Sequence, residues 1–155
     1  MSGICESHWY WAAAACCPAQ TAQAQRENLT ILFVDDDPFQ ALVYTAALES
    51  RFHPVRRVAD AIEALCLVED PRESCHLDLV ISAHHWAGVS GPDFVAELHR
   101  RLPSIPVLVL GTDEDLLQDY PALGGDVAFL RTPVTAQRLV ETVGTILTRG
   151  FRNVA

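Results

Sequence analysis

The sequence predicts an α/β fold in which a five-stranded parallel sheet carries helices on both faces. Two observations predict it. Short, strongly apolar segments recur along the chain, and stretches with helical spacing of apolar residues separate them. Strands that are apolar throughout are typical of parallel sheets buried on both faces, whereas half-exposed strands alternate apolar and polar residues.

Five segments fit strands, and four of them are apolar runs that end at a polar residue or a glycine. The exception is the second segment, which is short and carries two arginines. The predicted strands are TILFV (30–34), VRRVA (55–59), LDLVIS (77–82), IPVLVLG (105–111) and VAFLR (127–131).

Helical patterns fill the intervals between these strands. Asp37 and Asp60 can cap helix starts, and Pro38 suits a first helical position. Apolar residues at helical spacing mark a face in each expected helix: Phe39, Leu42, Val43, Ala46 and Ala47 in the first, Ile62, Leu65 and Cys66 in the second, Phe94, Val95 and Leu98 in the third, and Leu139, Val140, Val143 and Leu147 in the last, which ends at Gly150. A short helix is expected over 113–123.

Composition limits the classes of function. The chain has 155 residues, half of them apolar, a formal net charge of −9 and a pI near 4.9. An acidic chain has no electrostatic reason to bind nucleic acid or anionic lipid. Its five cysteines are odd in number, irregularly spaced and form no CxxC pair, which favours a reducing, cytoplasmic compartment. No apolar run reaches the 18 residues that a membrane span needs.

The first 27 residues differ from the rest. HWYWAAAACCPAQTAQAQ (8–25) is rich in alanine and glutamine and has three aromatic residues at its front. A signal peptide would carry Lys or Arg before such a region, and residues 1–10 have none. We expect residues 1–27 to be a disordered tail or a partner-binding segment, and residues 28–155 to form one domain.

Three consecutive carboxylates follow the first predicted strand, in ILFVDDDPF (31–39). In open α/β sheets, sites lie beyond the carboxyl ends of the strands. Residues 35–37, 83–85, 111–112 and 131–133 should therefore converge on one crevice.

Four segments together resemble the receiver domain of bacterial response regulators: ILFVDDDPF, DLVIS…GVSG, IPVLVLG and TPVTAQRL. The resemblance covers about residues 28–150 and implies a flavodoxin-like sheet with receiver topology. It implies a Mg²⁺-binding acidic pair at Asp35 and Asp36, a phosphoryl-accepting Asp at position 83, a hydroxyl at 111, and a Lys at 132 followed by a cis proline, here Pro133.

Three of those positions depart from the pattern, because the chain has Ala83, Gly111 and Thr132 there. Phosphoryl transfer needs a nucleophile, a cation and donors for the developing charge. We therefore expect a degenerate pseudo-receiver that lacks the acceptor, has no catalytic residue and is not an enzyme. It needs no cofactor, and any Mg²⁺ binding by Asp35, Asp36 and a backbone carbonyl near His85 should be weak.

AHHWAG (83–88) leaves alternatives open. A relocated acceptor at His84, His85 or Ser82 would make the chain a phosphotransfer protein, although Ser82 should point into the sheet packing. One histidine with the two acids would make it a metal-binding flavodoxin-like protein. The plainer interpretation is a solvent-facing loop that offers Trp86 to a partner.

The resemblance implies a stand-alone signalling module of a two-component or phosphorelay system. We expect it to act by protein–protein contacts without phosphorylation. Its partner would be a histidine kinase, a regulator or another signalling protein, or a second copy in a homodimer. By analogy with the family, Phe129 lies on the contact face at the position of a switch aromatic.

Overall fold

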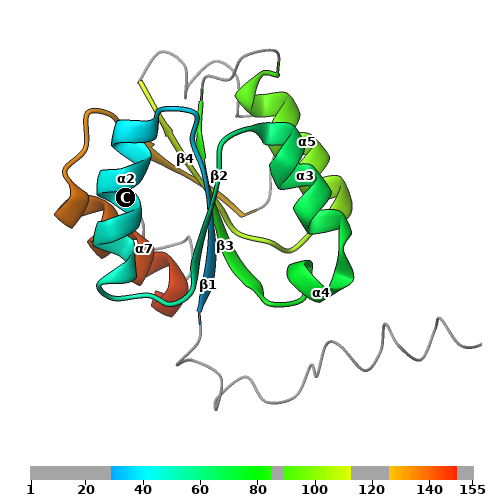
Figure 1. The fold of residues 1–155 in the computed structure, drawn as a ribbon, viewed down its shortest axis with the longest axis horizontal. Coiled ribbons are helices and arrows are strands. Elements are labelled where there is room, and N and C mark those ends of the chain that lie inside the picture. The colour runs from blue at the N-terminus through cyan, green and yellow to red at the C-terminus, as the bar shows by residue number, and fades with distance from the viewer. Residues whose placement is uncertain (1–28, 85–88, 113–125, 150–155) are drawn as a thin grey trace, which may run out of the picture.

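The computed structural model describes residues 29–84, 89–112 and 126–149. Its centre is one parallel sheet of five strands, in the order β2-β1-β3-β4-β5 (Figure 1). The strands are β1 (Thr30–Val34), β2 (Val55–Val58), β3 (Leu77–Ala83), β4 (Val107–Gly111) and β5 (Val127–Arg131). The predicted fold class is confirmed, and the strand order is that of flavodoxin-like sheets.

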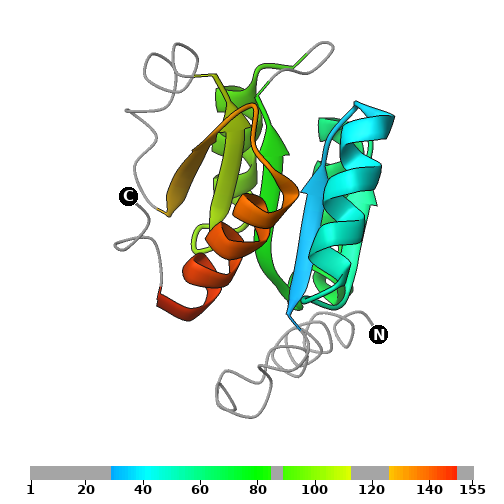
Figure 2. The same ribbon diagram turned by 90° about the vertical axis from the view of Figure 1, so that its left-hand side faces the viewer.

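Helices cover both faces of the sheet. On one face lie α2 (Pro38–Glu49) and α7 (Ala136–Arg149), which contact each other; on the other lie α3 (Ala61–Glu69), the short α4 (Pro71–Ser74) and α5 (Gly91–Arg101) (Figures 1 and 2). The predictions for residues 1–27, His85, Trp86, the helix over 113–123 and the helix end at Gly150 lie outside the described residues.

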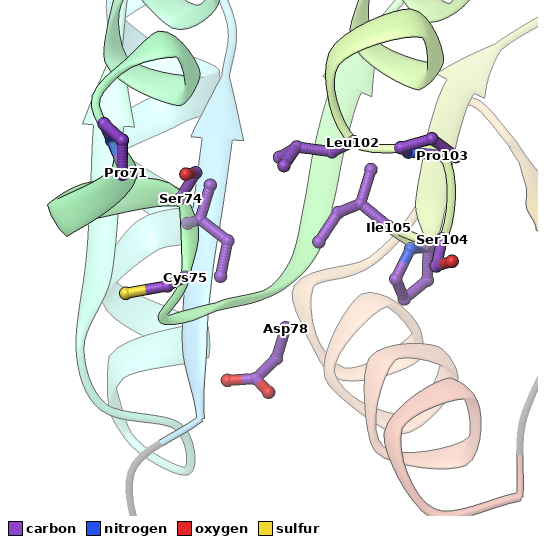
Figure 3. A pocket seen from close by; sticks show the side chains of 10 residues that line it. Pro71, Ser74, Cys75, Asp78, Leu102, Pro103, Ser104 and Ile105 are labelled. Carbon is purple, nitrogen blue, oxygen red and sulfur yellow. The ribbon is translucent and has the colours of Figure 1, made fainter. Parts of the chain in front are cut away.

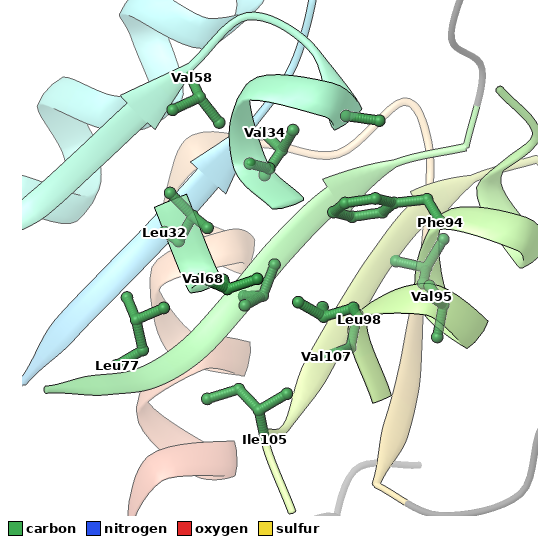
Figure 4. Packing of buried hydrophobic residues seen from close by; sticks show 14 residues of the cluster. Leu32, Val34, Val58, Val68, Leu77, Phe94, Val95, Leu98, Ile105 and Val107 are labelled. Atoms are coloured by element: carbon green, nitrogen blue, oxygen red, sulfur yellow. The ribbon is translucent and has the colours of Figure 1, made fainter. Parts of the chain in front are cut away.

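Two apolar cores result, one on each side of the sheet. Leu32, Val34 and Val107 point from the strands toward α3 and α5, where Phe94 and Leu98 meet them (Figure 4). Their neighbours in each strand point the other way, toward α2 and α7, and form the second core with Tyr44, Leu48, Leu139 and Val143. Because successive side chains of a strand point to opposite faces of the sheet, a strand that is apolar throughout contributes side chains to both cores.

The expected helix caps are present. Asp37 Oδ1 accepts hydrogen bonds from the backbone N–H groups of Phe39 (2.9 Å) and Gln40 (3.1 Å), and Pro38 is the first residue of α2. Asp60 Oδ1 accepts one from the N–H of Glu63 at 2.7 Å. These bonds satisfy donors that the first helical turn leaves without a partner.

The expected inward face of α3 is wrong at Ile62 and Cys66, whereas Leu65 is partly buried against the core as predicted. Ala61, Ala64 and Val68 are buried, whereas Ile62 is 65% exposed and Cys66 is also exposed. The small alanines let the helix approach the sheet closely. The prediction failed because both faces of this helix are apolar, so residue spacing alone does not select the buried one.

The buried face of α2 also differs from the apolar face noted in the sequence. Ala41, Tyr44 and Leu48 are buried, while Phe39 is 81%, Leu42 66% and Val43 56% exposed. Tyr44 packs edge-on against Phe33 of β1. The apolar spacing noted in the sequence therefore marks the outward face of this helix. In α5 and α7, by contrast, one face is clearly polar, and Phe94, Val95, Leu98, Leu139 and Val143 are buried as expected.

Candidate functional site

The acidic end of β1 meets the end of β3 at the place where the strand order reverses. Val34 of β1 pairs with Ser82 of β3, so the next residues, Asp35 and Ala83, follow on adjacent strands. Neighbouring strands lie about 4.8 Å apart. Sites in such sheets form at this switch point, and the topology thus places Asp35 beside the position where a phosphoryl acceptor would stand.

Asp35 is almost fully buried, with 2% of its surface exposed. Its Oδ1 accepts a hydrogen bond from the backbone N–H of Asp37 at 2.9 Å, and its Oδ2 is buried without a hydrogen-bond partner among the described residues. Burial raises the pKa of the Asp35 carboxyl, with smaller contributions from the neighbouring charges of Asp36 and Asp37. A buried oxygen of this kind is able to accept a proton or to contact a cation.

Two residues near Asp35 were not predicted from the sequence. The cation of Arg57, on β2, lowers the pKa of Asp35 and so opposes the effect of burial. Burial and the charge of Asp35 raise the pKa of Tyr44, whose hydroxyl donates to the Val134 carbonyl at 2.8 Å. The strand order could have indicated Arg57, because β2 is adjacent to β1 in the sheet.

The other two carboxylates are exposed. Asp37 is committed to capping α2. Asp36 keeps the position that the receiver pattern assigns to the second Mg²⁺-binding acid.

Ala83 and Gly111 end β3 and β4, and Thr132 directly follows the last residue of β5, as expected. Ala83 is half-buried and Gly111 is buried. The Gly111 carbonyl accepts a hydrogen bond from the Thr132 N–H at 2.9 Å, which joins the last two strands at the crevice. The Thr132–Pro133 peptide bond is cis, as the resemblance implies.

The structure describes two of the three residues proposed as substitute phosphoryl acceptors. Ser82 is fully buried and its hydroxyl donates to the Ala83 carbonyl at 2.8 Å, so the prediction that it points into the sheet packing is confirmed. His84 is only 8% exposed, which corrects the expectation of a solvent-facing loop at this residue. His85 and Trp86 lie outside the described residues.

The described donors do not form a closed metal site. Within residues 29–84, 89–112 and 126–149, no group of three or more His, Cys, Asp or Glu side chains could hold an ion. Two carboxylates remain, one buried with a spare oxygen and one exposed. Mg²⁺ prefers six oxygen ligands in near-octahedral geometry, and these two carboxylates supply only part of such a coordination shell.

Beyond the crevice, Phe129 of β5 is 38% exposed, in agreement with its predicted place on a surface. None of the described helices is long and apolar enough to cross a bilayer.

No protein-family model matches the chain. Two curated proteins are similar in sequence. The two-component response regulator-like protein APRR3 of Arabidopsis thaliana is 29% identical over 115 residues, which cover 72% of this chain and 23% of that protein. The sensor kinase CckA of Brucella abortus (strain 2308) is 28% identical over 121 residues, 77% of this chain and 13% of that protein. The chain thus spans less than a quarter of the length of either relative.

Solved receiver structures match the fold over nearly their own whole length. The receiver domain from the hybrid histidine kinase CckA superposes with a TM-score of 0.62 at 28% identity, covering 77% of this chain and 99% of that domain. A response regulator receiver protein from Sinorhizobium medicae WSM419 gives a TM-score of 0.68 at 19% identity, with 81% and 98% coverage. The fold is that of CheY-like receiver domains, and the sequence relatives and structural neighbours together support a receiver-like signalling module of two-component systems.

Proposed function

We propose that this chain is a pseudo-receiver: a cytoplasmic signalling module that works through protein contacts and takes up no phosphoryl group. The observation that carries the proposal is Ala83. A methyl group stands at the end of β3, beside the buried Asp35, where a receiver needs a carboxylate nucleophile.

The surrounding positions support the same conclusion. Gly111 has no side-chain hydroxyl to donate to a phosphoryl oxygen, and Thr132 has no positive charge to neutralise one. Electrostatic stabilisation of the developing charge accounts for most of the catalysis of phosphoryl transfer. A chain without the nucleophile and both donors is therefore proposed to be no enzyme and to need no cofactor, with at most weak Mg²⁺ binding at Asp35 and Asp36.

The surface offers an apolar stripe for partners. Phe39, Leu42 and Val43 follow one another along the outward face of α2, with more than half of each side chain exposed. Burying a large apolar side chain contributes about 1.5 to 3 kcal/mol, and helices commonly bind partners through such i, i+3, i+4 anchors. We name these three residues the α2 stripe. With Phe129 on β5, it gives a partner such as a histidine kinase, a regulator or another signalling protein two places to bind.

The acceptor chemistry is tested by incubating the chain with acetyl phosphate and Mg²⁺, followed by intact mass measurement and peptide mapping. The proposal predicts no added phosphoryl group. A stable adduct mapped to His84, His85 or Ser82 would replace it with a phosphotransfer protein that uses a relocated acceptor.

The contact surface is tested with a matched pair of variants. Leu42→Glu places a charge on the α2 stripe, and Ile62→Glu places one on α3 at nearly equal exposure (66% and 65%). Proteins that co-purify with the wild-type chain should be lost with Leu42→Glu and kept with Ile62→Glu. Retention by both variants would show that the α2 stripe is not the contact surface.

A further inference from the structure

A groove opens at the opposite end of the sheet from the acidic crevice. It has a volume of about 520 Å³, within the range of sites that hold small ligands or side chains. Ten residues from α4, the start of β3 and the segment before β4 line it: Pro71, Ser74, Cys75, Leu77, Asp78, Leu102, Pro103, Ser104, Ile105 and Pro106.

The lining is largely apolar, with the hydroxyls of Ser74 and Ser104 and one carboxylate, that of Asp78. Ser74 and Cys75 lie on one side, Leu102 to Ile105 on the other, and Asp78 at one edge (Figure 3). Leu77 and Ile105, which are nearly buried, also belong to the core beneath. A groove of this kind suits a side chain with a large apolar body and one N–H donor, which describes the indole of tryptophan.

The N-terminal segment enters the fold beside this groove. The backbone N–H of Thr30 donates to Asp78 Oδ2 at 2.8 Å, so the first strand begins in contact with a residue of the groove. The segment that precedes Leu29 is therefore attached to the fold within a few residues of the groove.

The composition of that segment matches the groove. Residues 7–25 contain no Asp, Glu, Lys or Arg, and HWYWAAAACC (8–17) places Trp9 and Trp11 among small apolar residues. The eleven residues 18–28 can span up to about 36 to 40 Å when extended, which is ample for a site next to their anchor. A tether of this length also gives an effective concentration on the order of millimolar, so a modest intrinsic affinity is enough.

We propose that residues 8–17 of this chain dock into the groove between α4 and the segment before β4, with a tryptophan ring between its apolar walls and the indole N–H donating to Asp78. This intramolecular docking goes beyond the proposed function and does not depend on it.

Tryptophan fluorescence tests the docking in the full chain. The three tryptophans are Trp9, Trp11 and Trp86, so Trp86→Phe leaves only the two in the segment. Their emission should be shifted to shorter wavelength and be shielded from acrylamide, relative to a synthetic peptide of residues 1–28. Emission identical to that of the peptide would overturn the proposal.

Two groove variants and one distant control, all in the Trp86→Phe background, locate the site. Leu102→Glu and the exposed Ser104→Glu each put a carboxylate in the lining, and both should return the emission to that of the peptide. Leu42→Glu, on the α2 stripe, should leave the emission shifted. The opposite pattern would mean that the segment covers the α2 stripe, and a shift that depends on protein concentration would mean that it binds a second copy; either result would refute the proposal.

A thiol cross-link provides a measurement that does not depend on the stability of a variant. Cys75 lines the groove, Cys66 is exposed on α3, and Cys16 and Cys17 end the proposed docking segment. A short bismaleimide should join Cys16 or Cys17 to Cys75 within one chain. Preferential joining to Cys66, or products that link two chains, would contradict intramolecular docking in this groove.

Discussion

Two carboxylates, the buried Asp35 and the half-buried Asp78, lie at opposite ends of the same sheet and differ in how their oxygens are used. Burial raises the pKa of both. Asp78 Oδ2 accepts a hydrogen bond from the Thr30 N–H and so joins β3 to β1. Among the residues that the structure describes, Asp35 accepts a hydrogen bond only from the Asp37 N–H, and its Oδ2 has no partner. Asp78 therefore stabilises the pairing of two strands. Burial of the Asp35 carboxylate costs free energy, and its one local hydrogen bond does little to offset that cost.

The difference separates a structural carboxylate from one that keeps the position of a functional site. An unpartnered buried oxygen costs about 1 to 3 kcal/mol, and proteins retain such costs mainly where a site needs them. In a receiver the cost would be offset by a cation and a phosphoryl group. Under the proposed function, Ala83 stands in place of the nucleophile, so Asp35 would keep its burial without the chemistry that uses it.

The largest expected effect concerns Asp78. Asp78→Ala removes the acceptor of the Thr30 N–H and should lower the free energy of unfolding by about 1 to 3 kcal/mol, measured by urea denaturation. Asp78→Asn keeps an acceptor oxygen and should cost less. Equal losses for the two variants would show that the strand-joining bond contributes nothing.

At Asp35, in contrast to Asp78, removing the charge should stabilise the fold. Asp35→Asn keeps an oxygen for the Asp37 N–H and removes the buried charge, so it should raise the free energy of unfolding at neutral pH by about 1 kcal/mol. Asp36→Asn, at an exposed carboxylate, should change it by less than about 0.5 kcal/mol. A loss of stability in Asp35→Asn would mean that the ionised carboxylate has a partner that compensates its burial.

The pH dependence of stability follows from the raised pKa of Asp35. The folded chain holds this proton more tightly than the unfolded chain, whose ordinary pKa is 3.8. The resulting stabilisation is fully present below pH 3.8 and is lost as the pH rises through the raised pKa of the folded state. The advantage of Asp35→Asn over the wild type should therefore be largest near neutrality and should shrink on acidification toward pH 3.8. A difference that is constant across this range would refute the assignment of the raised pKa to Asp35.

Mg²⁺ should have the smallest effect. With a dissociation constant in the millimolar range at best, Mg²⁺ at a concentration equal to that constant stabilises the fold by only about 0.4 kcal/mol. Calorimetric titration measures the affinity, and Asp35→Asn should abolish it. A micromolar constant would reveal ligands beyond Asp35 and Asp36.

Much of the fold could be predicted from the sequence because the strands are apolar throughout. The segments 30–34 and 127–131 match the observed strands residue for residue, and Asp37 and Asp60 cap helices as expected. The rotation of α2 and α3 about their axes could not be predicted, because apolar residues surround both helices. The short α4 was also missed, although Asp70 accepts a hydrogen bond from the Arg72 N–H and Pro71 occupies its first position.

The candidate site was predictable where it depends on the ends of strands. Asp35, Ala83, Gly111 and Thr132 end up where the topology requires. The electrostatic influence of Arg57 and the burial of His84 depend on packing between segments that are distant in sequence, so spacing along the chain did not indicate them. The groove at Asp78 was missed for the same reason, because two stretches that are distant in sequence, 71–78 and 102–106, form its walls.

The central claim is that three missing side chains, and not one, prevent phosphoryl transfer. Its most direct test is labelling by acetyl phosphate with Mg²⁺, measured by intact mass, in Ala83→Asp and in the triple variant Ala83→Asp, Gly111→Thr, Thr132→Lys. The account predicts that the single variant stays unlabelled and that the triple variant gains one phosphoryl group at position 83. Robust labelling of the single variant would contradict it.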